Sequence, residues 1–165
     1  MSKLKILEHE DIILKLDRIA WQIAEEFHRE KEIIVLGIQE RGSAIAELIH
    51  QKLVSICSGK ISIAHLHIDK DQALESSVEI VPNLKLASKA VVIVDDVLNS
   101  GITMAAVFKR VLEEKPRYVK VAVLANRDHK SFPIHPDFVG ISLATTVMEH
   151  ISLVKEDNKM AVYLV

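Results

Sequence analysis

The stretch AVVIVDDVLNSGITMAAVF, residues 90–108, decides how the rest of the chain is interpreted. Five apolar residues lead into two adjacent aspartates, then into a polar loop with one glycine, and then into a segment of helical character. Two carboxylates side by side at the end of a buried strand repel each other and lose hydration, so they need a cation, hydroxyl groups or water around them. The pattern therefore predicts a strand–loop–helix unit whose acids and loop contact a ligand.

The segments around this stretch alternate between strands and helices. Four short apolar runs predict strands, at 32–38, 61–68, 90–94 and 118–125. Apolar residues at three- and four-residue steps predict helices, at about 11–29, 43–53 and 103–113, the second capped by Ser43. This alternation implies right-handed crossovers and a mostly parallel sheet. We expect a three-layer α/β/α fold in one domain, residues 1–165, closed by a C-terminal β-hairpin at 151–165.

Composition and charge exclude several classes of protein. The 165 residues are 49% hydrophobic and 27% charged, which favours a folded core over disorder. The formal charge of -2 gives no global attraction to nucleic acid or anionic membranes. No uncharged apolar run approaches the roughly 18 residues of a membrane span, and charges interrupt the N-terminal residues too early for a secretory segment, so we expect a cytoplasmic protein. The single cysteine, Cys57, excludes an internal disulfide.

Ligands of open α/β sheets bind beyond the carboxyl ends of the strands, so the residues after each predicted strand are the candidates for a site. After Asp95 and Asp96, the loop leads into a helix whose N-terminal N–H groups favour an anion. Ser100 and Thr103 add hydroxyl groups, and Gly101 permits a close approach of the backbone. Acids for vicinal hydroxyls beside an anion pocket predict a sugar-phosphate site; the alternative is a capped helix beside a solvated acidic turn.

The spacing of this segment separates it from other phosphate-binding patterns. The chain lacks GxxxxGK[ST] and GxGxxG, and Asp95-Asp96-Val97 does not match the Asp-x-Asp of haloacid dehalogenase-like phosphatases. An apolar strand, a pair of acids and a small-residue loop resembles the phosphoribosyl pyrophosphate (PRPP) motif of the type I phosphoribosyltransferases. The resemblance implies that the paired acids hold the ribose 2- and 3-hydroxyls and, through these or water, Mg2+. It assigns the 5-phosphate to the loop residues Leu98, Asn99, Ser100, Gly101, Ile102 and Thr103.

Two further segments resemble parts of the same family. LGIQERG, residues 36–42, ends in an Arg-Gly turn before a helix and is similar to the pyrophosphate loop, which implies that Glu40, Arg41 and Gly42 contact pyrophosphate, with Arg41 also catalytic. A surface turn is the alternative. Lys70, after the strand at 61–68, resembles the basic residue that precedes the loop covering PRPP in the family, and we expect it at the pyrophosphate site.

The segment VAVLANRDHKSFPIHPDFVGISLATT, residues 121–146, narrows the resemblance. It is similar to the pyrimidine-operon attenuator proteins that are also uracil phosphoribosyltransferases, as are LDRIAWQI from Leu16 and GIQERG, so the resemblance spans nearly the whole chain. It implies that Val139 and Gly140 lie against the base and that Arg127 contributes on the base side, a surface salt bridge being the alternative for Arg127. It also implies a homodimer or a higher homo-oligomer.

The resemblance implies transfer of the phosphoribosyl group from PRPP to a nucleobase, with uracil favoured, and with release of pyrophosphate. Three departures leave other functions open: Glu40 where the group has a neutral Thr, Ile102 where it has a cation, and a shorter covering loop. One alternative is a non-catalytic regulator that binds PRPP or a nucleotide. Another is a purine phosphoribosyltransferase of the same fold.

RNA binding is not expected of this chain, although it is a function of the attenuator group. Asp17 and Trp21 stand where the group has Thr and His on its first helix. Lys130, His135 and Ile141 stand at later positions that match the RNA-contacting region of the attenuator group. An acid facing phosphates and the loss of cations weaken a binding mode that depends on neutralising phosphate charge.

Overall fold

The computed structural model describes residues 3–146 and 149–165 and contains a six-stranded sheet in the order β4-β3-β2-β5-β6-β7. All pairs in it are parallel except β3 with β4. This confirms the predicted mostly parallel sheet. The strands are β2 (Glu32–Ile38), β3 (Lys60–His67), β4 (Glu79–Val81), β5 (Ala90–Leu98), β6 (Tyr118–Arg127) and β7 (Phe138–Leu143).

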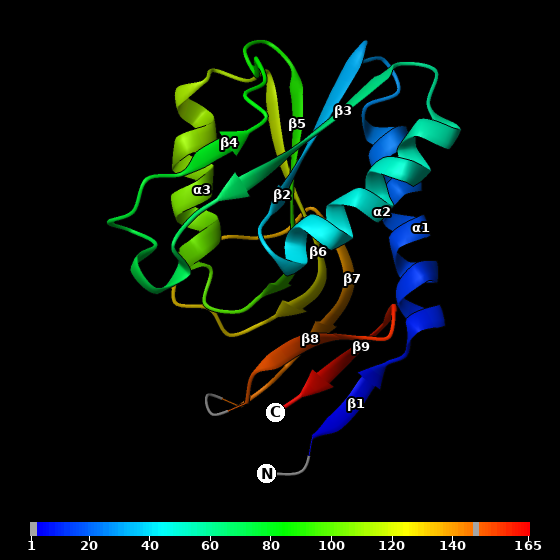
Figure 1. Cartoon of the computed structure of the whole chain (residues 1–165), viewed down its shortest axis with the longest axis vertical. Helices are drawn as coiled ribbons and strands as arrows, with labels where there is room; N and C mark the ends of the chain where they lie inside the picture. The colour runs from blue at the N-terminus through cyan, green and yellow to red at the C-terminus, as the bar shows by residue number, and fades with distance from the viewer. Residues whose placement is uncertain (1–2, 147–148) are drawn as a thin grey trace.

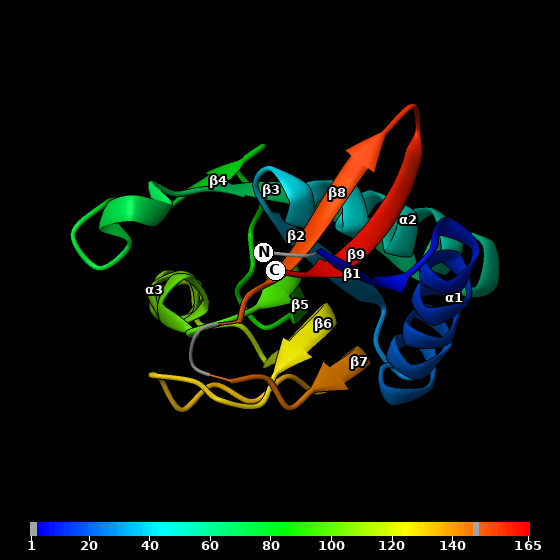
Figure 2. The same cartoon turned by 90° about the horizontal axis from the view of Figure 1, so that it is seen from below.

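Helices cover both faces of this sheet, as predicted (Figure 2). α1 (His9–Glu26) and α2 (Arg41–Ile56) share one apolar core with the sheet, and α3 (Ile102–Glu113) packs in a second core on the opposite face. The alternating side chains of β5 enter both cores: Val92 and Val94 face α1 and α2, whereas Val91 and Ile93 face α3. A strand buried on both faces explains the continuous apolar run that precedes the two aspartates.

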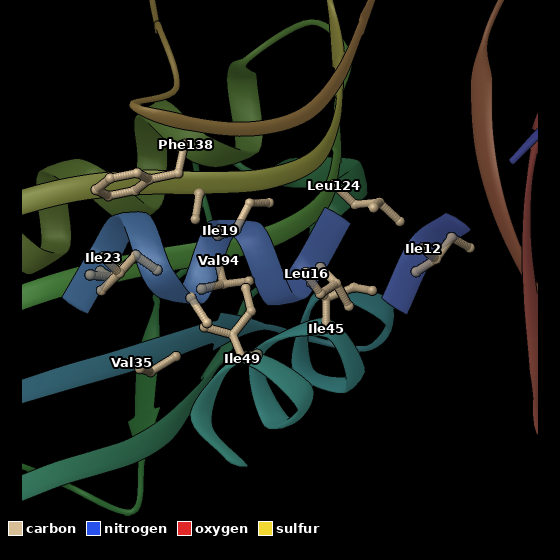
Figure 3. Packing of buried hydrophobic residues seen from close by; sticks show 14 of the residues in the cluster. Ile12, Leu16, Ile19, Ile23, Val35, Ile45, Ile49, Val94, Leu124 and Phe138 are labelled. Atoms are coloured by element: carbon tan, nitrogen blue, oxygen red, sulfur yellow. The ribbon is translucent and has the colours of Figure 1, made fainter. Parts of the chain in front are cut away.

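The helical spacing of α1 places its apolar residues in one stripe against α2 and the sheet (Figure 3). Burial of each such side chain contributes about 1.5–3 kcal/mol to folding. α1 begins with a capping box, in which the Glu8 side chain accepts the Asp11 N–H and the Asp11 side chain accepts the Glu8 N–H. The stripe consists of Ile12, Leu16, Ile19 and Ile23, and its partners include Val35, Ile45, Ile49 and Val94.

A second, antiparallel sheet with the order β1-β9-β8 lies beyond the carboxyl ends of β5, β6 and β7 (Figure 1). β8 (Ile151–Glu156) and β9 (Lys159–Leu164) form the predicted hairpin, whose turn residues Asp157 and Asn158 have positive φ. β1 (Leu4–Leu7), which the sequence pattern did not predict, pairs with β9. This small sheet therefore joins the two ends of the chain next to the strand ends of the main sheet.

Two predicted boundaries near the candidate site were wrong. β5 runs on through Leu98 instead of ending at Val94, because Asp95, Val97 and Leu98 continue to pair with β6. α2 begins at Arg41, so Ser43 is not its cap; the Ser43 hydroxyl donates to Gly37 O at 3.4 Å instead. Within the described ranges, the helices are all too short or too polar to cross a membrane.

Candidate active site

A cleft of about 480 Å³ lies where the carboxyl ends of β2, β3 and β5 face the small sheet. Ten of the residues predicted to bind PRPP line it, and they come from segments that are well separated in the sequence. The cleft is also lined by five residues without a predicted role, Gln39, Ile68, Val97, Met104 and Ile151. The ten predicted residues are Glu40, Arg41, Lys70, Asp95, Asp96, Leu98, Asn99, Ser100, Gly101 and Thr103.

The two carboxylates at the floor of the cleft are both buried: Asp95 is 5% and Asp96 6% exposed. The Asp96 backbone N–H donates to Asp95 Oδ1 at 2.9 Å. Burial raises the pKa of Asp95 well above its usual value, the neighbouring Asp96 charge raises it further, and the Lys70 ammonium opposes both. A buried carboxylate without a partner for its charge is costly. A ligand hydroxyl or a cation in the cleft would therefore stabilise the charged forms of Asp95 and Asp96.

Gly42, in the first turn of α2, lies directly against Asp95. A Cβ on Gly42 would lie 2.7 Å from Asp95 Oδ1 and 3.0 Å from Asp95 Cα, closer than side-chain carbons approach other atoms. Next to it, Arg41 Nη1 donates to Ser152 Oγ of β8 at 3.3 Å, and the peptide bond between Gln39 and Glu40 is cis. The glycine therefore allows the helix N-terminus and the acid pair to share one wall of the cleft, as an anion-binding helix start requires.

The loop from Leu98 to Thr103 has a fixed shape. Gly101 has φ +85°, a left-handed conformation that favours glycine. The Ser100 carbonyl accepts the N–H groups of Ser131 and Phe132 at 3.1 and 3.0 Å, and the Ser100 hydroxyl accepts the Ile102 N–H at 3.3 Å. Ile102 does not line the cleft; it packs against the core under α3. The position where the group has a cation therefore contributes a core contact in this chain.

The three predicted base-binding residues do not line this cleft. The carbonyls of Val139 and Gly140 accept from Arg18 Nη2 of α1 at 3.0 and 2.8 Å. Arg127, at the end of β6, is 8% exposed and donates from Nε to Thr145 Oγ1 at 2.7 Å and from Nη2 to Thr146 O at 2.8 Å. The predicted base-side residues therefore make hydrogen bonds within the protein and are not part of the lining of this cleft, although Asn126, next to Arg127, pairs with Leu98 of the phosphate loop.

Buried polar atoms without partners occur at one predicted site residue, Asn99, and at two residues that the sequence pattern missed, Gln39 and Asn126. Gln39 Oε1, Asn99 Oδ1 and Asn126 Oδ1 are buried and accept no hydrogen bond from the described residues. Gln39 directly precedes the residues predicted to contact pyrophosphate, so its position in the sequence was enough to include it among the predicted site residues. The sequence gives no comparable indication for Ile151, because this residue reaches the cleft from the small sheet. There, Asn99 Nδ2 donates to the Ile151 carbonyl at 3.5 Å. An unpartnered buried acceptor is expected to meet a donor from ligand or water.

The donor set of the cleft fits Mg2+ bound partly through ligand and water. No group of three His, Cys, Asp or Glu side chains in residues 3–146 and 149–165 is arranged to hold a metal by itself. Asp95 and Asp96 supply two carboxylates, and Mg2+ in proteins is commonly bound by one or two carboxylates together with phosphate and water oxygens. His65 and His67, which are two residues apart on one face of β3, do not belong to such a group in the described chain.

Comparison with known proteins identifies the family. The model of the phosphoribosyl transferase domain matches residues 2–156 of this chain. The chain belongs to the phosphoribosyltransferase family. Among curated relatives of this phosphoribosyltransferase, the bifunctional protein PyrR of Trichormus variabilis is 35% identical over 160 residues, covering 93% of this chain and 89% of the relative. The bifunctional protein PyrR of Staphylococcus epidermidis is 33% identical and covers 99% of both chains.

Solved structures show that this phosphoribosyltransferase has the type I fold. The hypoxanthine phosphoribosyltransferase of Trypanosoma cruzi matches with a TM-score of 0.79 at 11% identity, covering 96% of this chain and 94% of that one. A hypoxanthine-guanine phosphoribosyltransferase from Bacillus anthracis matches with a TM-score of 0.72 at 18% identity, covering 85% and 83%. At these identities the likeness concerns the fold, so the predicted fold class is confirmed and the base is not identified.

Proposed function

We propose that this phosphoribosyltransferase transfers the 5-phosphoribosyl group of PRPP to a nucleobase, uracil being favoured, and releases pyrophosphate. The observation that carries the proposal is the convergence of two buried carboxylates, an anion-binding helix start and a fixed small-residue loop on one cleft. Uracil is favoured because residues 121–146 resemble the attenuator proteins that are also uracil phosphoribosyltransferases, and the relatives named PyrR, 33–35% identical over nearly the whole chain, support that resemblance. We further expect a homodimer or a higher homo-oligomer and no binding of RNA.

The roles of the residues follow from where charge develops. The bond between ribose C1 and the pyrophosphate oxygen breaks, a bond from C1 to a base nitrogen forms, and the proton of that nitrogen leaves to solvent. Positive charge on the ribose ring is stabilised by nearby carboxylates, as in glycoside cleavage, and we assign this to Asp95 and Asp96. Arg41 and Lys70 donate to the departing pyrophosphate.

The same acids would hold Mg2+ through ribose hydroxyls or water. When bound, Mg2+ offsets the negative charge of pyrophosphate. The loop from Leu98 to Thr103 binds the 5-phosphate through backbone N–H groups and the hydroxyls of Ser100 and Thr103. No nucleophilic side chain is required for this displacement.

The test is product formation from PRPP, Mg2+ and each of uracil, hypoxanthine, guanine, adenine and xanthine, followed by mass spectrometry. We expect one nucleoside monophosphate, formed only with Mg2+. A purine nucleotide instead of the uracil product would change the assigned base and leave the reaction class intact. No product from any base, while PRPP still binds in calorimetry, would favour the regulator that binds PRPP without turnover.

The charge balance of the cleft makes Glu40 a specific prediction. Among the described residues that line the cleft, the acids are Glu40, Asp95 and Asp96 and the cations are Arg41 and Lys70. Glu40 is exposed at the N-terminal position of α2, where it repels an incoming pyrophosphate. We expect Glu40→Gln to bind Mg2+–PRPP about 3- to 10-fold more tightly, because a change of ~1 kcal/mol is about fivefold in affinity.

Calorimetry at two salt concentrations measures this effect. Glu47→Gln, on the same helix but outside the cleft, is the matched control and should leave the affinity unchanged. The gain at Glu40 should shrink at high salt, because exposed charges are screened. A weaker affinity for the Glu40 variant would mean that this carboxylate helps to hold the metal.

A further inference from the structure

Arg127 is a buried cation with a specific set of partners. Its guanidinium donates to the Thr145 hydroxyl at 2.7 Å and to the Thr146 carbonyl at 2.8 Å, and Thr145 is itself 5% exposed. A buried charge of this kind is retained only when its donors are well satisfied. Two short hydrogen bonds from one rigid planar group fix both the side chain of Thr145 and the main chain of Thr146.

The pair Thr145–Thr146, to which Arg127 donates, follows β7 and precedes β8 in the chain. Just before it, the Asp128 N–H donates to Leu143 O at 3.1 Å. The Thr146 N–H itself donates to Glu149 Oε2 at 2.8 Å, and this bond, with a smaller contribution from the Arg127 charge, lowers the pKa of Glu149. β8 then begins at Ile151. The bonds of Arg127 are therefore made only a few residues before the position at which the chain enters the cleft.

Ile151 is the point at which the small sheet contributes an apolar side chain to the cleft. It is 3% exposed, and its carbonyl accepts from Asn99 of the phosphate loop at 3.5 Å. A flat aromatic base requires an apolar surface beside the ribose carbon that it attacks. A small displacement of Ile151 would therefore change the fit of the base while leaving the loops around Asp95 and Gly42 in place.

We propose that Arg127 is a positioning residue that acts through Thr145 and Thr146 to place Ile151 against the nucleobase, and that it does not itself contact substrate. The proposal rests on the proposed function. According to the proposal, the hydrogen bond between Arg127 and Thr145 controls the affinity for the base. PRPP affinity is assigned to other residues that line the cleft, at 39–41, 70, 95–101 and 103, which follow the strands of the main sheet.

The test combines Arg127→Gln, Thr145→Val and the double variant, with Arg110→Gln as the matched control. Arg110 lies on α3 and pairs with Glu114 at 2.7 Å, away from the cleft. We expect Arg127→Gln to lower kcat/KM for the base about 10- to 100-fold through KM, while the affinity for Mg2+–PRPP in calorimetry changes less than about threefold. Thr145→Val should cause a smaller loss in the same parameter, and the double variant should be no worse than Arg127→Gln, since residues that act as one unit are not additive.

Hydrogen exchange gives a readout that does not depend on activity. Backbone amides in peptides that contain Thr146 and Ile151 should exchange at least about tenfold faster in Arg127→Gln and Thr145→Val than in the wild type or Arg110→Gln. If the wild type makes no nucleotide, the proposed function fails, and exchange still tests the positioning role. Unchanged exchange, an equal loss of PRPP affinity, or a base defect in Arg127→Gln that Thr145→Val does not share would overturn the proposal.

Discussion

Replacing Asp95 by asparagine is expected to abolish function and to stabilise the ligand-free protein. Loss of the carboxylate removes the group assigned to the ribose hydroxyls and the ring cation, so kcat/KM should fall at least about 100-fold, or ~2.7 kcal/mol. Asp96→Asn should show a similar loss of turnover. Calorimetry should find Mg2+–PRPP binding strongly weakened in each variant. Full binding and turnover in the double variant would refute the site assignment.

The gain in stability follows from the raised pKa of Asp95. Burial and the Asp96 charge hold this pKa above the unfolded value, so the folded protein binds the proton more tightly than the unfolded chain. The Asp95 carboxyl therefore lowers the free energy of unfolding as pH rises from the pKa that Asp95 has in the unfolded chain to the pKa that it has in the folded protein. Above the pKa of the folded protein, this loss of stability reaches its full value. The Asp95→Asn variant avoids that cost, and the amide oxygen of the new side chain can still accept the Asp96 N–H.

Thermal unfolding at several pH values measures this difference. We expect Asp95→Asn to melt a few degrees higher than the wild type at neutral pH, because ~1 kcal/mol corresponds to ~2–4 °C in a domain of this size. The difference should shrink as pH falls. Asp137→Asn is a useful contrast, because Asp137 accepts from Lys120 Nζ and the Val121 N–H, and its removal should destabilise. A lower melting temperature for Asp95→Asn at neutral pH would contradict the inferred cost of the buried carboxylate.

Gly42→Ala is the second variant with a large expected effect. Alanine is ordinarily about 1 kcal/mol better than glycine within a helix. At this position its Cβ would lie 3.0 Å from Asp95 Cα and 3.1 Å from Val94 O, so backbone must move to admit it. Overpacking of this kind costs about 1–3 kcal/mol, and the movement would separate Arg41 from the acid pair. We therefore expect both a lower melting temperature and a loss of Mg2+–PRPP binding.

Gly59→Ala provides the matched control for this variant. Gly59 also faces main-chain atoms, but its added Cβ would lie 3.1 Å from Lys31 O, far from the cleft, with no second contact below 3.2 Å. It should cost less stability and leave PRPP affinity unchanged. Normal PRPP binding by a folded Gly42→Ala protein would show that the helix start can separate from Asp95 without consequence.

The part of the site that was predictable from sequence consists of short contiguous segments. The sheet and the helices on both of its faces followed from strand-length apolar runs and helical spacing, because each pattern reports burial of its own element. The acid pair and the loop with the glycine could also be predicted, because the strand end, the loop and the helix start are adjacent in the chain. The cleft brings Asp95, Arg41 and Lys70 together because parallel strands place their carboxyl ends at one edge.

What could not be predicted depends on contacts between distant segments. The pairing of β1 with β9 joins the two ends of the chain, and no local pattern reports it. The position of Ser43 was predicted incorrectly because its hydroxyl bonds back to Gly37, which is a tertiary contact. The side chain of Ile102 packs against the core, so the expected contribution of this residue to the phosphate site stays a prediction for its backbone N–H. The predicted roles of Val139 and Gly140 at the base stay predictions.

The pairing of β1 with β9 also has a consequence for biosynthesis. All strands of the main sheet precede β8 and β9 in the chain, so the nascent chain can assemble the floor of the cleft while its cover is still missing. β1, which precedes the other described strands in the chain, has no partner in the described sheet until β9 appears. A strand that precedes its only partner in the described sheet by most of the chain keeps an unpaired edge until that partner is made, so the small sheet closes only after the main sheet is complete in sequence.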